Sequence, residues 1–288
     1  MRHDRFVTYV FTASAALVVL VIGAIVVFVA RQGLATFAAV SPFQFFFSTR
    51  WEPWQDQFGA FSFIFGSLAV TVLAILFGGP VGLATAVFMA RVAPVRVRAL
   101  MRQAVDLFVG IPSVVYGWLG LTLLVPFISA YLNAGGGGFG ILAAALILAV
   151  MILPTVVSLT EDALRSLPQT LEEGSLALGA TRWQTIWHVL LPAAGPTVVA
   201  AFILAMGRAV GETMAVQMVI GNAPILPSGP AAPTATMTSE IVTEMGNTPY
   251  GSTWNNALFA LALVLLLASL AAIVTIRLVA SRRQAIKS

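Results

Sequence analysis

Residues Ser166–Pro192, SLPQTLEEGSLALGATRWQTIWHVLLP, form a polar interruption in the second half of a very apolar chain. The stretch opens with signals for a helix start. Ser166 and Gln169 have the spacing of a capping box, in which each side chain bonds the backbone of the other. Pro168 between them is tolerated in a first helical turn. These residues predict a helix that starts directly after an apolar segment.

A second set of signals predicts that this first helix ends and another begins. Gly179 suits a helix end, because glycine adopts the left-handed conformation without steric cost. Thr181 and Gln184 then have the spacing of a second capping box, and Pro192 is expected to end the second helix. The stretch therefore predicts a small two-helix unit between two apolar segments, which suggests a docking surface.

The composition identifies the chain as an integral membrane protein. Of its 288 residues, 59% are hydrophobic and 9% are charged, whereas soluble domains carry about 25% charged residues. Long apolar runs predict an all-α fold, because a helix satisfies its own backbone hydrogen bonds within lipid. The absence of cysteine excludes disulfides, thiolate metal sites and cysteine nucleophiles.

The chain lacks the sequence features of an ATPase or a membrane-embedded enzyme. Lys287 is its only lysine, so a phosphate-binding loop of the GxxxxGK[ST] type cannot occur. The run Gly135–Gly138 is therefore expected to be a flexible turn. No HExxH, GxSxG or carboxylate cluster occurs in an apolar segment, which makes an enzyme the weakest interpretation.

Six apolar segments are long enough to cross a bilayer core of about 30 Å at about 1.5 Å per residue. The first is longer than the apolar region of a signal peptide, so we expect it to be retained as a helix. The whole chain, residues 1–288, is then a single transmembrane domain. The predicted spans are residues 7–30, 61–90, 110–130, 140–159, 195–221 and 257–279.

The distribution of arginine and lysine predicts how these spans are oriented. With the N-terminus inside, the inside segments hold twelve basic residues, and the outside segments hold only Arg31 and Arg50. Basic residues are retained on the cytoplasmic side, so both termini and residues 166–192 are expected in the cytoplasm. The proline-rich loop of residues 222–253 is expected outside.

Residues 31–60 are predicted to be a second outside loop, which carries Trp51, Glu52, Pro53 and Trp54. Tryptophan favours the membrane–water interface, so the simplest interpretation of this cluster is an interfacial anchor. The alternative is that the cluster grips a partner.

An ionisable pair occurs within the fifth predicted span, in the sequence GRAVGETMAV of Gly207–Val216. Arg208 lies about halfway along this span, where a charge costs about 2.5–3.5 kcal/mol to insert. Glu212 at i+4 falls on the same helical face and is expected to neutralise it partly. One interpretation is a charge pair that fixes helix packing. The other is a positive site on a water-filled path for an anion, because a guanidinium donates two hydrogen bonds to an oxyanion at once.

The two-helix unit also carries a pattern that resembles a known motif. From Glu173 to Pro192 the pattern is E-G-S-x3-G-x9-V-x-L-P. It is similar to the EAA motif of ATP-binding-cassette (ABC) importer permeases, with glycine and serine replacing two alanines and valine replacing isoleucine. In that family the motif forms a coupling helix that docks on the ATPase subunit, which implies this role for residues 166–192. The residues implied in ATPase coupling are Glu172, Glu173, Leu176 and Gly179.

Further stretches narrow the resemblance to one branch of these permeases. Gly59–Leu68, Gly110–Gly117, and Gly207–Val216 followed by Ile220–Asn222 look like the PstC-type permeases of phosphate-specific ABC importers. The resemblance covers residues from about 6 to 283. It implies a type I importer fold with six transmembrane helices and a cytoplasmic coupling helix between the fourth and fifth. It also implies that Arg208 and Glu212 lie on the path of phosphate.

The same resemblance implies an ATP-driven phosphate importer in the bacterial cytoplasmic (inner) membrane. The partners would be a sister A-type permease, two ATP-binding-cassette subunits and an extracytoplasmic phosphate-binding protein. The chain itself would catalyse no reaction and bind no cofactor, metal or nucleic acid, since ATP and Mg would be held by the ATPase. Two alternatives stay open: a permease for another oxyanion, or a secondary transporter, whose fold often shows inverted repeats.

Overall fold

The computed structural model describes residues 2–132 and 137–284, so part of the predicted turn at Gly135–Gly138 lies outside the described residues. Within them, six helices are long and apolar enough to cross a membrane, which confirms the predicted number of spans. These helices are Val7–Ala38, Phe61–Arg91, Ser113–Leu132, Ile141–Arg165, Arg182–Gly211 and Thr253–Thr275.

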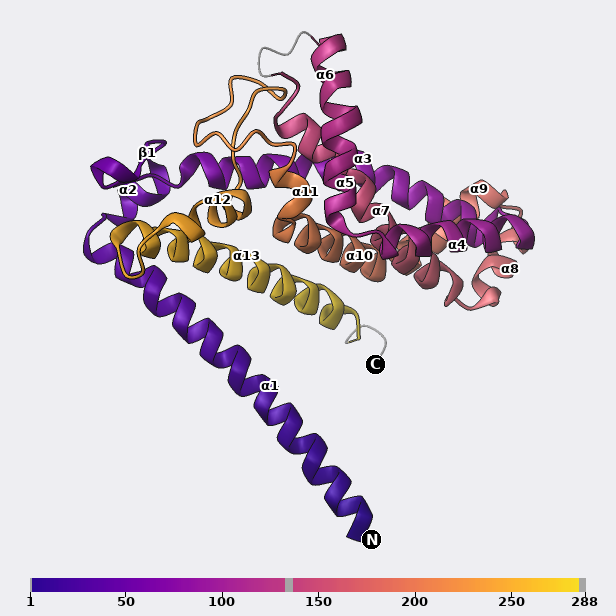
Figure 1. The fold of residues 1–288 in the computed structure, drawn as a ribbon. Coiled ribbons are helices and arrows are strands. Elements are labelled where there is room, and N and C mark those ends of the chain that lie inside the picture. Colours follow the sequence, from indigo (N-terminus) through magenta and orange to yellow (C-terminus); the bar gives the residue numbers. More distant parts are fainter. Residues whose placement is uncertain (1, 133–136, 285–288) are drawn as a thin grey trace.

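Four long helices run lengthwise through the molecule and define its two ends (Figure 1). They are α3 (Phe61–Arg91), α7 (Ile141–Arg165), α10 (Leu191–Gly211) and α13 (Thr253–Gln284). One end, called the α12 end, carries α2 (Pro42–Phe47), the strands β1 (Trp51–Glu52) and β2 (Gln57–Phe58), and α12 (Met237–Glu244). The opposite end, called the α8 end, carries α4 (Val95–Gly110), α8 (Gln169–Ala177) and α9 (Arg182–Thr185).

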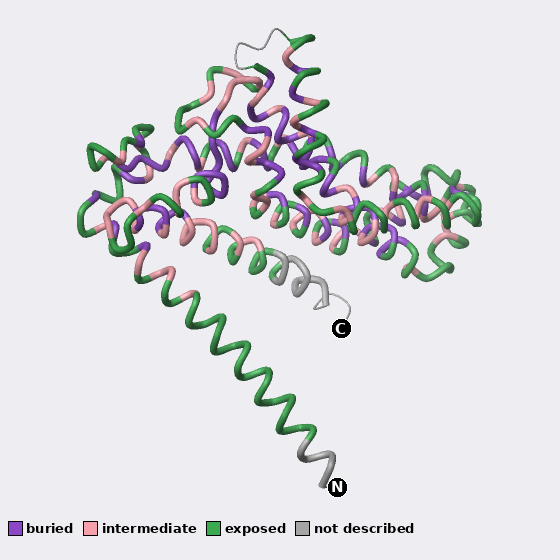
Figure 2. Tube along the Cα trace, in the orientation of Figure 1, coloured by how far each residue is buried: buried purple, intermediate pink, exposed green. Residues whose placement is uncertain are grey.

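Two helical segments depart from the lengthwise direction. α1 (Arg2–Ala35) packs on α13 through an edge-to-face contact of Phe28 with Phe259, and then diverges toward its N-terminus, where it is exposed (Figure 2). α5 (Ser113–Leu119) continues through a π-helical turn into α6 (Val125–Leu132), and this segment rises steeply from the others (Figure 1).

The pair α3 and α7 forms the centre of the bundle, and glycine allows its close approach. A Cβ atom on Gly78 would lie 2.6 Å from the carbonyl oxygen of Ala149. A Cβ atom on Gly82 would lie 2.9 Å from Cγ1 of Val156. Small residues let the backbones of membrane helices pack closely, so these two positions set the distance between α3 and α7.

A larger side chain at Gly78 should therefore destabilise the bundle. We expect Gly78→Val to cost about 1–3 kcal/mol through overpacking, because its side chain would meet backbone that cannot move aside easily. Thermal unfolding of the purified protein in detergent measures this loss. Gly195→Val is the matched control, since Gly195 lies in α10 with nothing within 4 Å of its added Cβ. Equal unfolding temperatures for the two variants would contradict this account of the α3–α7 contact.

The predicted capping box at Ser166 is wrong. Ser166 belongs to the last turn of α7, with φ of −74° and ψ of −9°, and its Oγ donates to the carbonyl of Ala163 at 2.9 Å. An N-cap residue needs an extended backbone, which Ser166 does not have. α8 instead begins at Gln169, directly after Pro168, without a side-chain cap.

The prediction that Pro192 ends the second helix is also wrong. α9 continues through a π-helical segment, Ile186–Leu190, into α10, where Pro192 lies in the first turn. The wider π turn changes which carbonyl faces the proline ring, so the helix passes the proline without breaking. The fifth span is therefore one continuous helix, Arg182–Gly211, rather than residues 195–221.

The two predicted outside loops are more ordered than expected. Within residues 222–253, α12 begins with a capping box of Thr236 and Ser239, and the backbone N–H of Met237 donates to Ser67 Oγ of α3 at 2.9 Å. Within residues 31–60, β1 pairs with β2 in antiparallel register. Trp51 is buried against Phe58 and Phe63, so the interfacial anchor is wrong for Trp51, whereas Trp54 is 89% exposed.

Candidate functional site

The turn between α8 and α9 has the geometry that the sequence predicts. Gly179 has a φ of +86°, and its N–H donates to the carbonyl of Leu176 at 2.9 Å. The second capping box is confirmed: the Gln184 N–H donates to Thr181 Oγ1 at 3.3 Å, and the Thr181 N–H donates to Gln184 Oε1 at 2.8 Å. The unit of α8 and α9, residues 169–185, is called the docking unit below.

Side-chain contacts fix the docking unit to the rest of the bundle. Arg91 Nη1, at the end of α3, lies 2.6 Å from Glu172 Oε2, and the same guanidinium donates to the carbonyl of Leu164. The hydroxyl groups of Ser175 and Thr185 lie 2.9 Å apart and join α8 to α9. A displacement of α8 would therefore be passed to the ends of α3 and α7.

The outward face of the docking unit is exposed and partly apolar. Glu173, Leu176 and Gly179 are exposed, whereas Glu172 is committed to Arg91 within the chain. Leu178 is 91% exposed and Trp183 is 62% exposed. Sequence analysis missed both. The position of Leu178 directly before the helix-ending Gly179 was the sequence signal that could have indicated an exposed apolar residue.

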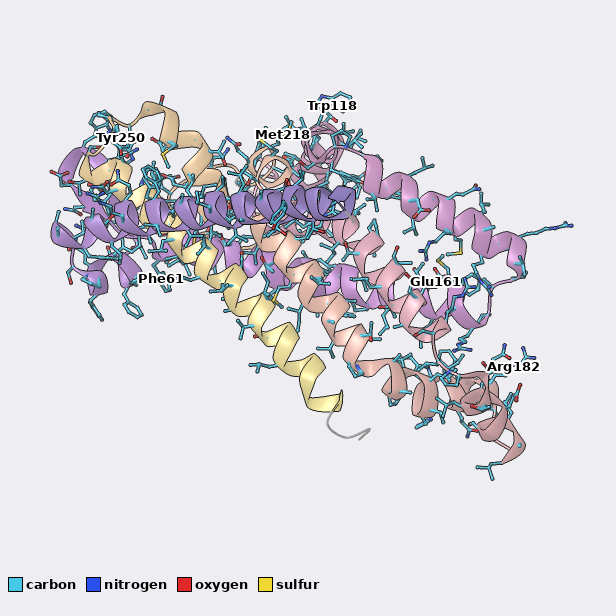
Figure 3. All side chains as sticks on the ribbon, turned by 90° about the horizontal axis from the view of Figure 1, so that it is seen from below. Phe61, Trp118, Glu161, Arg182, Met218 and Tyr250 are labelled. Carbon is cyan, nitrogen blue, oxygen red and sulfur yellow. The ribbon has the colours of Figure 1, made fainter. Side chains whose placement is uncertain are left out.

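A second ionic cluster, which sequence analysis also missed, joins α4 to α7 at the same end (Figure 3). Arg102 Nη1 lies 2.8 Å from Glu161 Oε2 and 3.2 Å from Asp162 Oδ1. Glu161 is 1% exposed and is also approached by Arg165 Nη1 at 3.4 Å. The hydrogen bond from Arg102 to Glu161 raises the pKa of Arg102 above its usual value, although burial opposes the shift. Because the buried carboxylate is paired, the contact holds α4 against α7.

The expected pairing of Arg208 with Glu212 is wrong. Arg208 lies in the last turn of α10, and the helix ends at Gly211, so Glu212 is extended with φ of −70° and ψ of +131°. Glu212 Oε1 instead accepts from the backbone N–H of Ala215 at 3.3 Å, at the start of α11 (Met214–Gln217). Residues at i and i+4 share a face only while the helix continues.

Arg208 is left without a counter-ion among the side chains that the structure describes. It is exposed, and its Nη1 lies 3.5 Å from Oγ1 of Thr155 on α7. It is also close enough to interact electrostatically with the Tyr116 side chain of α5. The guanidinium therefore lies beside the Thr155 hydroxyl, whereas the Tyr116 hydroxyl donates to the carbonyl of Phe108 at 2.8 Å. A guanidinium without a described counter-ion suits a small oxyanion.

At the α12 end, Glu240 is a buried acid with a perturbed pKa. Burial raises its pKa to about 8, the nearby carboxylate of Glu244 adds to the rise, and the Trp51 side chain opposes it. The folded protein therefore binds one proton more tightly than the unfolded chain, so its free energy of unfolding should fall as pH rises from about 4.5 to about 8.

This pH dependence is testable in thermal unfolding. We expect the unfolding temperature of the wild type to decrease across this pH window, and the decrease to be smaller in Glu240→Gln, which stays neutral. Glu52→Gln is the control, because Glu52 is exposed at the same end of the molecule. A wild-type slope that persists unchanged in Glu240→Gln would assign the dependence to another group.

Comparisons with known proteins identify the family of this chain. The family of binding-protein-dependent transport system inner membrane components matches residues 78–284. A probable ABC transporter permease protein, YqgH of Bacillus subtilis, is 48% identical and covers 95% of this chain and 89% of its own. A phosphate transport system permease protein, PstC of Xylella fastidiosa, is 34% identical, and the match covers 98% of this chain and 91% of the PstC chain.

Solved structures agree with the fold. The inward-facing MetNI methionine ABC transporter matches with a TM-score of 0.56 at 25% identity, covering 75% of this chain and 93% of that one. A bacterial ABC transporter involved in the import of alginate matches with a TM-score of 0.55 over 95% of both chains; at 15% identity it supports the fold alone. The chain belongs to the family of binding-protein-dependent transport system inner membrane components, and it is the membrane-spanning permease subunit of an ABC importer.

Proposed function

We propose that this permease subunit carries phosphate, as the C-type member of an ATP-driven phosphate importer. The observation that carries the proposal is Arg208, a guanidinium without a described counter-ion beside the hydroxyl group of Thr155. A tetrahedral oxyanion accepts several hydrogen bonds at once, and the planar guanidinium presents a fork of donors that matches it. The similarity to PstC proteins at 31–34% identity favours phosphate over other oxyanions.

The proposed assembly contains a sister A-type permease, two ATPase subunits and an extracytoplasmic phosphate-binding protein. The chain would hold neither ATP nor Mg and would catalyse no bond cleavage itself. The α8 end would face the cytoplasm, together with both termini, and the α12 end would face outward. The excess of basic residues in the segments at the α8 end supports this orientation.

The continuous helix Arg182–Gly211 suggests how ATP hydrolysis reaches the substrate. The ATPases would press on the exposed face of the docking unit around Glu173, Leu176 and Gly179. From Arg182 to Arg208 the helix extends about 39 Å, at about 1.5 Å per residue. Movement of the docking unit would tilt this helix as a rigid body and expose Arg208 to alternate sides of the membrane.

Uptake by the reconstituted complex tests the proposal. With ATP inside the vesicles and the phosphate-binding protein outside, labelled phosphate should accumulate and sulfate should not compete. Competition by sulfate at equal concentration would favour the permease of another oxyanion. Accumulation that follows an ion gradient without ATP would favour a secondary transporter instead.

A further inference from the structure

A pocket of about 430 Å³ opens at the α12 end, and its lining includes neither Arg208 nor any residue of the docking unit. It lies at the end marked by Phe61 and Tyr250 in Figure 3, opposite the end marked by Glu161 and Arg182. Its chemistry comes from two carboxyl groups and three indole rings. The residues concerned are Glu240, Glu244, Trp51, Trp54 and Trp254.

The polar groups of this pocket are buried but incompletely paired. Glu240 is 5% exposed and forms no ion pair within the described part of the chain. Trp51, 7% exposed, lies near it, but its Nε1 has no partner of normal hydrogen-bond geometry. Trp254 Nε1 is likewise buried without a partner. Buried polar groups are nearly always paired in native proteins, so the Glu240 carboxyl, which has no described ion pair, indicates a site that a donor ligand completes. The two indole N–H groups are donors themselves and do not bear on a cationic ligand.

The arrangement of carboxyl groups and rings favours an organic cation. Glu240 and Glu244 are four residues apart on α12 and therefore lie on one face. Trp54 and Trp254 meet edge to face with their centroids 5.4 Å apart. The faces of indole rings attract cations, and a guanidinium is weakly hydrated and stacks on such rings. A hydrated metal ion would gain little from a pocket lined by tryptophan.

The charge of the surrounding surface points to the same class of ligand. Residues 31–60 and 222–253 carry two arginines, Arg31 and Arg50, against four acids, so the formal net charge of these segments is −2, or −1 while Glu240 is protonated below its pKa of about 8. The four acids are Glu52, Asp56, Glu240 and Glu244. The chain as a whole has a net charge of +4, so the negative charge is particular to this end.

We propose that this pocket receives an arginine side chain of the soluble protein that delivers the substrate. This inference rests on the proposed function, because that protein would dock on the α12 end. The guanidinium would lie between Glu240 and Glu244 and stack on Trp54 or Trp254. Charge complementarity of this kind speeds docking and fixes the orientation of the partner.

The first test uses a probe in place of the partner. The complex in lipid nanodiscs is mixed with the peptide acetyl-Gly-Arg-Gly-amide, and saturation-transfer NMR measures contact with the arginine protons. We expect a signal for this peptide and none for the same peptide with citrulline, which is neutral and of equal shape. Glu244→Gln should lose the signal, and Glu52→Gln, which removes a charge beside the pocket, should retain it. Equal signals from both peptides, or displacement of the peptide by Ca²⁺, would overturn the proposal.

The second test measures docking of the delivery protein through its stimulation of ATP hydrolysis. We expect Glu244→Gln to raise the concentration for half-maximal stimulation roughly tenfold, without lowering the maximal rate. Glu244→Arg should fail to dock and should recover when the matching arginine of the partner is changed to glutamate. If Glu244→Gln left the concentration for half-maximal stimulation unchanged, the pocket assignment would be overturned. Phosphate uptake by the wild type would still uphold the proposed function in that case. A wild-type complex that accumulates no phosphate would contradict the proposed function directly.

Discussion

Replacing Arg208 by Gln should reduce phosphate uptake by at least about a hundredfold, while the complex still assembles in the membrane. A hydrogen bond between charged groups contributes about 1.5–3 kcal/mol, the guanidinium fork makes two of them to an oxyanion, and a factor of ten corresponds to about 1.4 kcal/mol. Gln retains two donors but loses the charge. Uptake of labelled phosphate into vesicles and co-purification of the subunits provide the two measurements.

Two further variants make the Arg208 result specific. Arg208→Lys keeps the charge but loses the planar fork, so we expect partial uptake with weaker discrimination between oxyanions. Arg31→Gln removes an exposed arginine from the other end of the chain and should leave uptake unchanged. Normal uptake by Arg208→Gln would remove this residue from the path.

Replacing Gly179 by Val should uncouple ATP hydrolysis from transport. The φ of +86° at this position is costly for a β-branched residue, by about 1–2 kcal/mol or more. Nothing lies within 4 Å of an added Cβ, so the effect would come from the backbone alone. We expect the turn between α8 and α9 to rearrange, the ATPase to dissociate more readily, and hydrolysis to proceed without uptake.

The docking unit offers a matched control for this variant. Gly174 lies within α8, also with nothing within 4 Å, and has no positive φ. Gly174→Val therefore adds the same atoms without the conformational conflict. Gly179→Asn should also retain coupling, since asparagine tolerates the left-handed conformation. Full co-purification and unchanged coupling in Gly179→Val would show that the docking assignment is wrong.

The spans and the second capping box could be predicted from sequence because each depends on local signals. Apolar length alone identifies six helices, and Thr181 with Gln184 bond each other within four residues. The prediction that Pro192 ends a helix was wrong because a proline ring breaks a helix only when the turn before it is a regular α turn. The π-helical segment before it is a tertiary adjustment that no residue type marks.

The predicted pairing of Arg208 with Glu212 was wrong for a similar reason, because it also assumed that the α-helix continues. The helix ends at Gly211 without a proline, and what replaces the ion pair is a hydrogen bond from the backbone of α11 to Glu212. The order within residues 222–253 is also set by distant contacts. A Cβ on Gly66 would lie 2.3 Å from the carbonyl of Ala235, so this segment packs directly on α3. Contacts between residues that are far apart in the sequence cannot be predicted from the local structural preferences of those residues.

The π-helical segment Ile186–Leu190 sets the angular phase between the docking unit and Arg208. An α-helix turns about 100° with each residue, and a π turn contains about one residue more than an α turn. Loss of one residue here would restore regular α geometry and leave the guanidinium at nearly the same angle relative to α8, because the wider turn takes up the extra residue; loss of one residue from the regular part of α10 would instead rotate it by about 100°. A single-codon deletion at this point would therefore leave the guanidinium facing the same wall of the path, with both flanking motifs intact, whereas the same deletion within α10 would turn it toward another wall.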